Sequence, residues 1–128
     1  IEMCFSFSGL KTALLYYLKK NPAVRETHLA DVAASYQAAV MDALALRVER
    51  GLAATGARML ACVGGVARNA LLRQKLDETA RRHGARLLLT PLAYCTDNAA
   101  MVAAAAGLRA QAGLDNPPAL EADPSLPL

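Results

Sequence analysis

The sequence has no tryptophan and only two histidines and three cysteines, so it has few residues from which to build a zinc or dithiol site. Cys4, Cys62 and Cys95 include no Cys-x-x-Cys pair, which excludes the usual zinc and dithiol spacings. His28 and His83 lie far apart, and each has an ordinary place at a helix terminus. An odd number of scattered cysteines is typical of reduced thiols. We therefore expect a cytoplasmic protein whose Cys62 and Cys95 are core thiols.

Long hydrophobic runs are also missing. No window reaches the roughly 18 uninterrupted apolar residues that a membrane-spanning helix requires. The longest such stretch, residues 98–108, is short and mostly alanine. Residues 1–20 carry charged residues and serines rather than the basic start and apolar run of a secretory signal. We therefore expect no membrane partner.

What is present is an apolar chain of one-domain size. Of its 128 residues, 55% are hydrophobic and 20% are charged, which requires extensive burial or a partner surface. The net charge is only +3, but basic residues crowd the segment 68–86. That segment is either a modest basic surface for a polyanion or an ordinary solvated helix face. Because the chain opens with Ile1 and a strand-like run follows almost at once, we expect a fragment of a longer protein.

Hydrophobic periodicity predicts an alternation of strands and helices. In chain order we expect a strand over residues 4–8, a helix over 10–20, a long helix from between residues 27 and 31 to residue 51 or 56, a strand over 59–63, a helix over 69–83, a strand over 87–89 and a helix over 96–113. Asn21-Pro22 should stop the first helix, and Thr96-Asp97 can cap the last. The continuous apolar run 59–63 predicts a strand buried on both faces of a parallel sheet. The whole order predicts a parallel α/β layer, with further strands ahead of the chain.

Two loops that follow predicted strands offer glycines at helix starts, the usual place for ligands in open α/β sheets. Residues 5–12 present hydroxyls and helix amides, but a helix N-cap explains them better. Residues 62–69 end a strand with Gly64-Gly65, where a ligand could approach the backbone and a helix start favours a phosphate or an adenylate. The spacing matches neither a Walker loop nor a dinucleotide fingerprint, so a structural turn is an equal alternative.

Two polar side chains are further candidates: Asn69 ends the second loop, and Asp97 lies in a third loop, residues 94–101, which follows the last predicted strand. Asn69 can donate to and accept from a ribose or a base, or it can simply cap a helix. Asp97 can ligate a metal or cap a helix, and capping is the commoner fate of such a residue. One carboxylate does not make a metal site. No nucleophile is paired with a base, so no catalytic residue is assigned.

Three ordered motifs and part of the long helix resemble the C-terminal half of the tRNA adenosine threonylcarbamoyltransferase family, also known as TsaD, Gcp or YgjD. The matching segments are Phe5-Ser6-Phe7-Ser8-Gly9-Leu10-Lys11-Thr12, Ala33-Ala34-Ser35-Tyr36-Gln37, Gly64-Gly65-Val66-x-x-Asn69 and Cys95-Thr96-Asp97-Asn98-x-Ala100-Met101. The likeness covers nearly all of residues 4–110. Three motifs in order are far more specific than any one of them.

The resemblance implies a fold and an activity. The fold is an RNase-H-like lobe of the actin, sugar kinase and chaperone ATPase superfold, with residues 1–113 as part of the C-terminal lobe and residues 114–128 as a flexible proline-rich tail. The activity is tRNA modification, in which threonylcarbamoyl passes from threonylcarbamoyl-AMP to the exocyclic amine of the adenosine next to the anticodon. The implied partners in bacteria are tRNA, a paralogous subunit and a small ATPase.

The resemblance also implies roles for particular residues. Gly64, Gly65 and Asn69 would bind the adenylate. Asp97 would ligate one divalent metal ion, with iron(II) favoured and zinc as the alternative. The effect of Arg68, a basic residue near the glycine turn, does not follow from the family pattern.

The chain departs from the family in what it lacks. The His-x-x-x-His pair that supplies the other main metal ligands has no counterpart, so we expect the isolated chain to have no transferase activity. Three rival interpretations stay open: a sugar or acetate kinase of the same superfamily, the metalloendopeptidase of the family's older label, and a non-catalytic lobe that docks on a partner. No zinc-protease motif supports the endopeptidase.

Overall fold

A computed structural model describes residues 5–114 of the chain. The chain divides into two compact units, Ile1–Cys95 and Thr96–Leu128. Within the described residues, the first unit contains α1 to α4 and the strands β1 and β2, and the second contains α5, Ala99–Gln111. The predicted last helix is thereby confirmed. Apart from Leu114, the predicted tail lies outside the described residues.

The N-terminal motif begins a helix rather than a strand. α1 (Phe7–Lys20) starts directly after Ser6, whose Oγ accepts a hydrogen bond from the backbone N–H of Gly9 at 3.3 Å. The prediction of a strand over residues 4–8 is therefore wrong for the described part of that segment, which excludes Cys4. A lone strand leaves its backbone N–H and C=O groups unpaired, whereas a capped helix pairs them internally.

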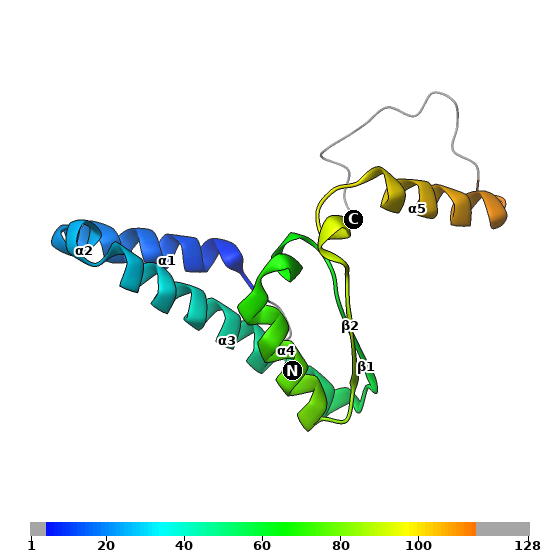
Figure 1. The fold of residues 1–128 in the computed structure, drawn as a ribbon, viewed down its shortest axis with the longest axis horizontal. Coiled ribbons are helices and arrows are strands. Elements are labelled where there is room, and N and C mark those ends of the chain that lie inside the picture. The colour runs from blue at the N-terminus through cyan, green and yellow to red at the C-terminus, as the bar shows by residue number, and fades with distance from the viewer. Residues whose placement is uncertain (1–4, 115–128) are drawn as a thin grey trace. The chain divides into compact units, whose positions relative to one another are not determined.

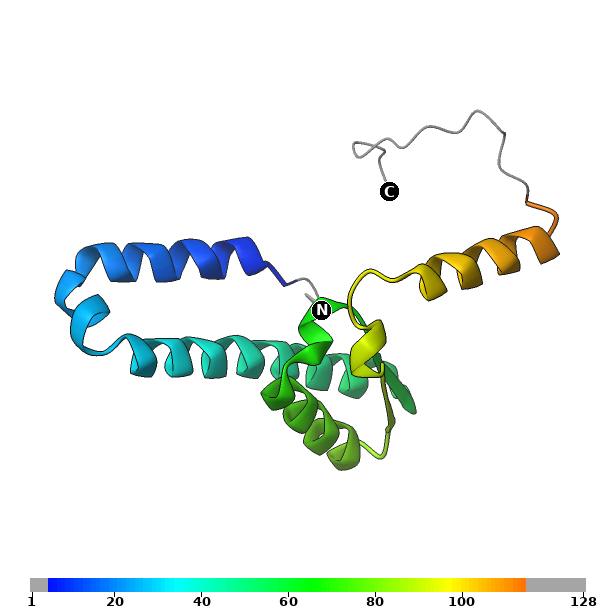
Figure 2. The same ribbon diagram turned by 45° about the horizontal axis from the view of Figure 1, so that its top comes forward.

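A short helix follows where the sequence predicted only a stop. Asn21 ends α1 as expected, and Pro22 then takes the first position of α2 (Pro22–Thr27), where its missing N–H breaks no helical bond. α3 (Leu29–Thr55) confirms the predicted long helix, and Gly56 ends it with a φ of 64°. Figures 1 and 2 show α1 and α3 as two antiparallel arms joined through α2.

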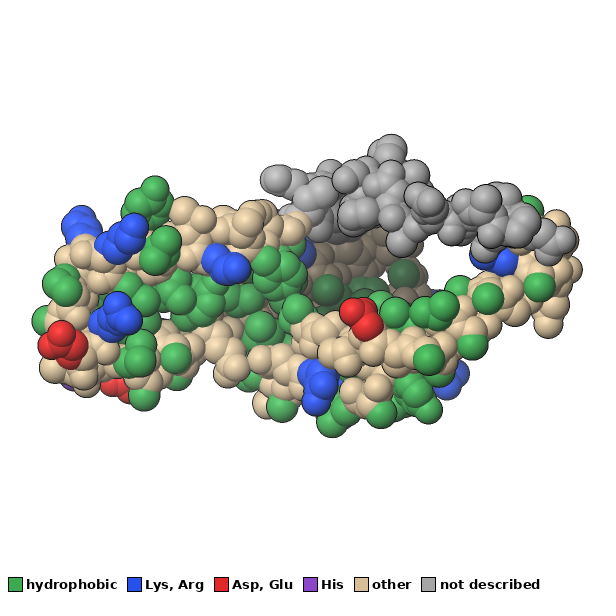
Figure 3. Space-filling view, turned by 90° about the horizontal axis from the view of Figure 1, so that it is seen from above, with side chains coloured by type: hydrophobic (Ala, Val, Ile, Leu, Met, Phe, Trp, Pro, Cys, Tyr) green, Lys and Arg blue, Asp and Glu red, His purple; other side chains and the backbone are tan. Residues whose placement is uncertain are grey.

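The two arms border an apolar groove of about 610 Å³. Figure 3 shows hydrophobic side chains gathered between the arms. Leu10, Leu14 and Tyr17 of α1 face Val32 and Tyr36 of α3 across it. α1 has no buried residue, so the apolar stripe that its spacing predicts is only partly covered.

A parallel strand pair with one crossover helix forms the centre of the first unit. β1 (Met59–Cys62) pairs with β2 (Arg86–Leu89), so that Met59 lies opposite Arg86, and α4 (Ala70–Arg82) connects them. Two of the three predicted strands are thereby confirmed, and the described residues contain only these two. The fold is thus an α/β arrangement of helices on a small parallel sheet.

The sheet is covered on one face. Leu60, Cys62 and Leu87 pack toward the core beneath α4. On the opposite face Met59 is 60% exposed and Leu88 is 38% exposed. The expectation that β1 is buried on both faces is therefore wrong for this structure, because α4 lies against one face only.

The core lies between α3 and α4. Val40 and Met41 of α3 meet Leu72 and Leu76 of α4 in a single buried cluster. Helical spacing predicts that Leu71, Leu72, Leu76 and Ala80 of α4 point inward. Leu72, Leu76 and Ala80 are buried, and Leu71 is partly buried against the cluster.

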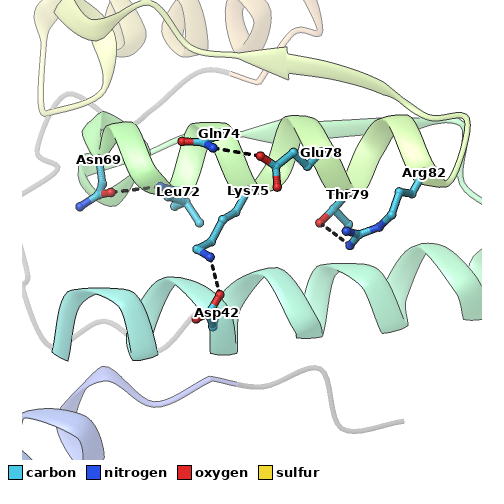
Figure 4. Close-up of polar contacts among 8 residues, drawn as sticks. All are labelled: Asp42, Asn69, Leu72, Gln74, Lys75, Glu78, Thr79 and Arg82. Atoms are coloured by element: carbon cyan, nitrogen blue, oxygen red, sulfur yellow. Dashed lines mark hydrogen bonds and ion pairs between the residues drawn. The ribbon is translucent and has the colours of Figure 1, made fainter. Parts of the chain in front are cut away.

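Charged side chains at the border of this core pair with one another. The pairs are Lys75 with Asp42, Arg82 with Glu49, and Arg81 with Asp77. Figure 4 shows Lys75 of α4 reaching Asp42 on α3. Such solvated pairs contribute little stability. They do neutralise much of the basic segment 68–86, which favours a solvated helix face over a surface for a polyanion.

α3 is long and apolar enough to cross a membrane by length and composition alone. The core helix of a soluble protein passes the same test. α3 buries Val40, Met41 and Leu52 and forms ion pairs with α4 through Asp42 and Glu49. These contacts account for the apolar residues that α3 buries in this fold, although only 11% of the candidate span is buried in the structure.

Shortening a core side chain should destabilise the first unit. Leu76 is 3% exposed, and Leu76→Ala leaves a cavity, so the free energy of unfolding should fall by about 2–5 kcal/mol. Leu15→Ala, at a 52% exposed position of α1, is the matched control and should change it by about 0.5 kcal/mol at most. Denaturant titration followed by circular dichroism measures both. Equal losses in the two variants would contradict the assigned core.

Candidate functional site

The turn Gly64–Asn69 joins the end of β1 to the start of α4. Gly64 has a φ of 87°, which other residues rarely adopt. The 3-10 helix Gly65–Arg68 follows, and the N–H of Ala67 donates to the carbonyl of Gly64 at 3.0 Å. An added Cβ at Gly64 or Gly65 would meet no protein atom within 4 Å. The backbone of this turn is therefore open to a ligand.

Asn69 is held from two sides. Its Oδ1 accepts from the N–H of Leu72 at 3.0 Å, which makes it the N-cap of α4, and its Nδ2 donates to Oε1 of Gln37 at 3.0 Å. Figure 4 shows the cap. The capping alternative for Asn69 is thereby confirmed. It leaves room for a ligand, because a carboxamide carries a second Nδ2 hydrogen.

Gln37 is a residue of this site to which the sequence assigned no role. It lies on α3, 32 positions before Asn69, and no local spacing rule connects residues so far apart. The only sequence signal was its place in the family-like segment 33–37. The packing of α3 on α4 brings the two side chains together.

The start of α4 supplies further polar groups to the turn. The first N–H groups of a helix have no intrahelical acceptor. In α4 the side chain of Asn69 accepts a hydrogen bond from only one of them, the N–H of Leu72. The helix dipole adds partial positive charge, and the first turn of α4 contains no acidic residue. The turn can therefore hold an anionic group such as a phosphate.

The hydroxyl groups of the first motif bond locally. Ser6 Oγ caps α1 and lies 3.0 Å from Ser8 Oγ, and Thr12 Oγ1 donates to the carbonyl of Ser8 at 3.0 Å. The prediction that this segment is a helix N-cap is confirmed, but the helix starts at Phe7, three residues before the predicted start at residue 10.

Asn98, rather than Thr96-Asp97, caps α5. Its Oδ1 accepts from the N–H of Met101 at 2.9 Å, and its Nδ2 donates to the carbonyl of Thr96 at 2.9 Å. The capping expectation for Thr96 and Asp97 is therefore wrong, because the next residue reaches the helix amide. Asp97 is exposed, and its carboxylate makes no hydrogen bond or ion pair with any other described residue.

No metal site is complete within the described part of the chain. No three His, Cys, Asp or Glu side chains there are grouped to hold an ion. His28 Nδ1 lies 3.6 Å from Asp31, and His83 Nε2 lies 3.6 Å from Glu49. Asp97 belongs to the second unit, whereas the glycine turn belongs to the first. A single carboxylate does not fit an iron or zinc ion by itself.

Two thiols lie near the turn. Cys95 is 2% exposed and Cys62 is partly buried, which agrees with the prediction of core thiols. Burial raises the pKa of the Cys62 thiol, the Arg73 guanidinium lowers it, and Cys95 raises it further. A thiol kept neutral in this way is a poor nucleophile.

A parallel β–α–β unit with an open glycine turn before a capped helix places the chain among α/β proteins, and comparison with known proteins gives its family. The TsaD family model, described as tRNA N6-adenosine threonylcarbamoyltransferase, matches residues 1–104. A protein of that name from Salinibacter ruber is 47% identical, covering 97% of this chain and 39% of the relative. Those from Thermotoga neapolitana and Polaromonas naphthalenivorans are 48% and 47% identical, covering 95% and 91% of this chain.

The chain therefore belongs to the tRNA N6-adenosine threonylcarbamoyltransferase family. It spans between 33% and 39% of the length of these three relatives. The resemblance that the motifs indicated is thereby confirmed.

Removing the Gln37 amide should loosen Asn69 without unfolding the chain. Gln37→Ala takes away one hydrogen bond, so the free energy of unfolding should fall by about 0.5–1.5 kcal/mol. The side-chain amide resonance of Asn69 should shift in the ¹⁵N correlation spectrum. Gln74→Ala, which breaks the exposed bond from Gln74 to Glu78, is the matched control and should leave that resonance in place. An unchanged Asn69 signal in Gln37→Ala would contradict the contact.

Proposed function

We propose that this chain is part of the C-terminal lobe of a transferase that modifies tRNA. The reaction moves threonylcarbamoyl from threonylcarbamoyl-AMP to the exocyclic amine of the adenosine next to the anticodon. Membership of the family supports the reaction class. The open turn Gly64–Asn69 is the observation that carries the proposal, because its chemistry suits the AMP part of the donor.

In this proposal the turn binds the adenylate through backbone and amide groups. Gly64 and Gly65 let the ligand reach the backbone, the start of α4 receives the phosphate, and the second Nδ2 hydrogen of Asn69 donates to the ribose. No side chain of the turn acts as an acid or base, so its role is to hold and orient the donor. The same helix start stabilises the negative charge that AMP carries as it leaves.

We also propose that the unit β1–α4–β2 belongs to an RNase-H-like lobe of the actin, sugar kinase and chaperone ATPase superfold. The parallel pair and its helical crossover support this fold, and so does the family. The remaining strands would come from outside the described residues, in keeping with relatives that are much longer than this chain.

Asp97 is the one residue of this chain that we propose as a metal ligand. Its exposed carboxylate, which bonds no other described residue, would be one ligand of a divalent ion, with iron(II) favoured and zinc as the alternative. The described residues do not complete such a site, so the other ligands would come from elsewhere in the protein. We assign no step of the reaction to the metal.

A lobe that docks on a partner without catalysis is the second candidate. The apolar groove between α1 and α3 favours it, because it leaves hydrophobic surface uncovered in the described chain. Within the first proposal the corresponding partners are tRNA, a paralogous subunit and a small ATPase in the cytoplasm. A lobe that only docks binds neither the adenylate nor a metal, so variants of Gly65 and Asp97 separate the two candidates.

Gly65→Ala distinguishes a ligand-binding turn from a purely structural one. Gly65 has no positive φ and open space around it, so stability should change by only about 0.5 kcal/mol. The added methyl group occupies space that the ligand needs. In the protein made from the complete reading frame, affinity for threonylcarbamoyl-AMP should therefore fall about tenfold or more.

Isothermal titration calorimetry measures that affinity. Gly107→Ala in α5 is the matched control, since its surroundings are equally open, and it should bind like the parent. Parent-like affinity in Gly65→Ala would remove the turn from the adenylate site.

Removing the Asp97 carboxylate should strongly reduce transfer. In the complete protein, Asp97→Ala should lose most bound iron or zinc by mass spectrometry and most threonylcarbamoyladenosine formed on tRNA, by about a hundredfold. Asp31→Asn, an exposed aspartate on α3, should retain both. The isolated 128-residue chain should form no product. Full metal content in Asp97→Ala would exclude Asp97 as a ligand, and product from the isolated chain would show that no outside ligands are needed.

A further inference from the structure

Arg73, near the start of α4, places its guanidinium against three acceptors. Its Nε donates to the carbonyl of Ala67 at 2.5 Å, and its Nη2 donates to the carbonyl of Thr90 at 2.6 Å. Nη2 also lies 3.4 Å from Sγ of Cys95. Hydrogen bonds from a charged donor in a partly buried setting are among the stronger ones in proteins.

This arginine differs from the other basic residues of its helix. Lys75, Arg81 and Arg82 meet carboxylates near solvent. Arg73 instead bonds main-chain carbonyls, and two of its partners are almost fully buried: Ala67 is 1% exposed and Cys95 is 2% exposed. Its charge is therefore directed into the fold and not toward a polyanion.

The acceptors of Arg73 come from the two loops that follow the parallel strands. Ala67 lies in the turn after β1, and Thr90 and Cys95 lie in the loop after β2. The N–H of Thr90 donates to the carbonyl of Cys62 at 3.2 Å, one step beyond the strand ladder. Arg73 thus ties both loops together at the carboxyl edge of the sheet, where ligands bind in such folds.

We propose that Arg73 is a positioning residue for binding of the adenylate donor. This inference rests on the proposed function, because it takes the turn Gly64–Asn69 to be the adenylate site. By holding the carbonyl of Ala67, Arg73 fixes the 3-10 segment inside that turn. The backbone N–H groups of the segment then keep one orientation before the ligand arrives, so that binding costs less conformational entropy.

The planar fork of arginine is needed for this role. Nε and Nη2 reach carbonyls of two different loops at once, whereas the three donors of lysine share a single nitrogen. We therefore expect Arg73→Lys to lose most of the effect, even though it keeps the charge. Arg73→Gln should lose it as well.

Steady-state transfer by the complete protein tests the role. The KM for threonylcarbamoyl-AMP should rise about tenfold in Arg73→Lys and Arg73→Gln, while kcat stays within about threefold of the parent. Arg81→Gln, an exposed arginine of the same helix, is the control and should match the parent. A merely structural arginine would reduce the amount of active protein, and so the apparent kcat, at unchanged KM. That result, or a parent-like KM in Arg73→Lys, would overturn the proposal.

Hydrogen–deuterium exchange gives a readout that does not depend on transfer. Arg73→Gln should speed exchange in residues 64–69 and 90–95 relative to α3, and Arg81→Gln should not. Unchanged exchange in those two segments would overturn the positioning role even if transfer is lost. If the parent protein transfers nothing, the proposed function fails and the role in adenylate binding fails with it, while faster exchange would still show that Arg73 holds the turn.

Discussion

The packing of α3 on α4 is the contact on which the rest of the first unit depends. It buries Val40 and Met41 against Leu72 and Leu76, and such burial is the main favourable term in folding. The two strands contribute only four residues each, too few to stand without a helix on one face. Once the helices pack, Gln37 of α3 lies within hydrogen-bond distance of Asn69, the N-cap of α4. Hydrophobic packing thus brings the two helices together, and this hydrogen bond then orients the Asn69 side chain.

The parallel order of the strands decides where the polar groups gather. Both strands end at the same edge of the sheet, so the turn after β1 and the loop after β2 are neighbours. α4 runs back against the strands, which places its start at that edge together with the positive end of its dipole. An amide-rich, electropositive corner follows from the topology, and Arg73 can bond to both loops because its helix begins between them.

Elements with strong periodicity were predictable from the sequence, and those decided by neighbours were not. The spacing of leucines indicated α4, and Asn69 marked its start as a possible cap; Gly84, with a φ of 61°, follows its end. Residues 5–8 fit a strand or a capped helix start equally well, and only the surroundings decide. Thr96, Asp97 and Asn98 offer three caps in succession, and backbone angles that the sequence does not reveal select the last. The bond from Gln37 to Asn69 depends on tertiary packing alone.

α4 is engaged on two sides, by α3 and by the sheet, which leaves a narrow strip of its surface free. Gln74 and Glu78 lie on that strip, one turn apart, joined by a hydrogen bond of 3.0 Å and directed away from α3 in Figure 4. A fluorophore attached there would sit on the rigid element that carries the turn, yet touch neither the core nor the ligand-facing backbone. For a chain without tryptophan, this strip is where an optical reporter of the turn can be installed.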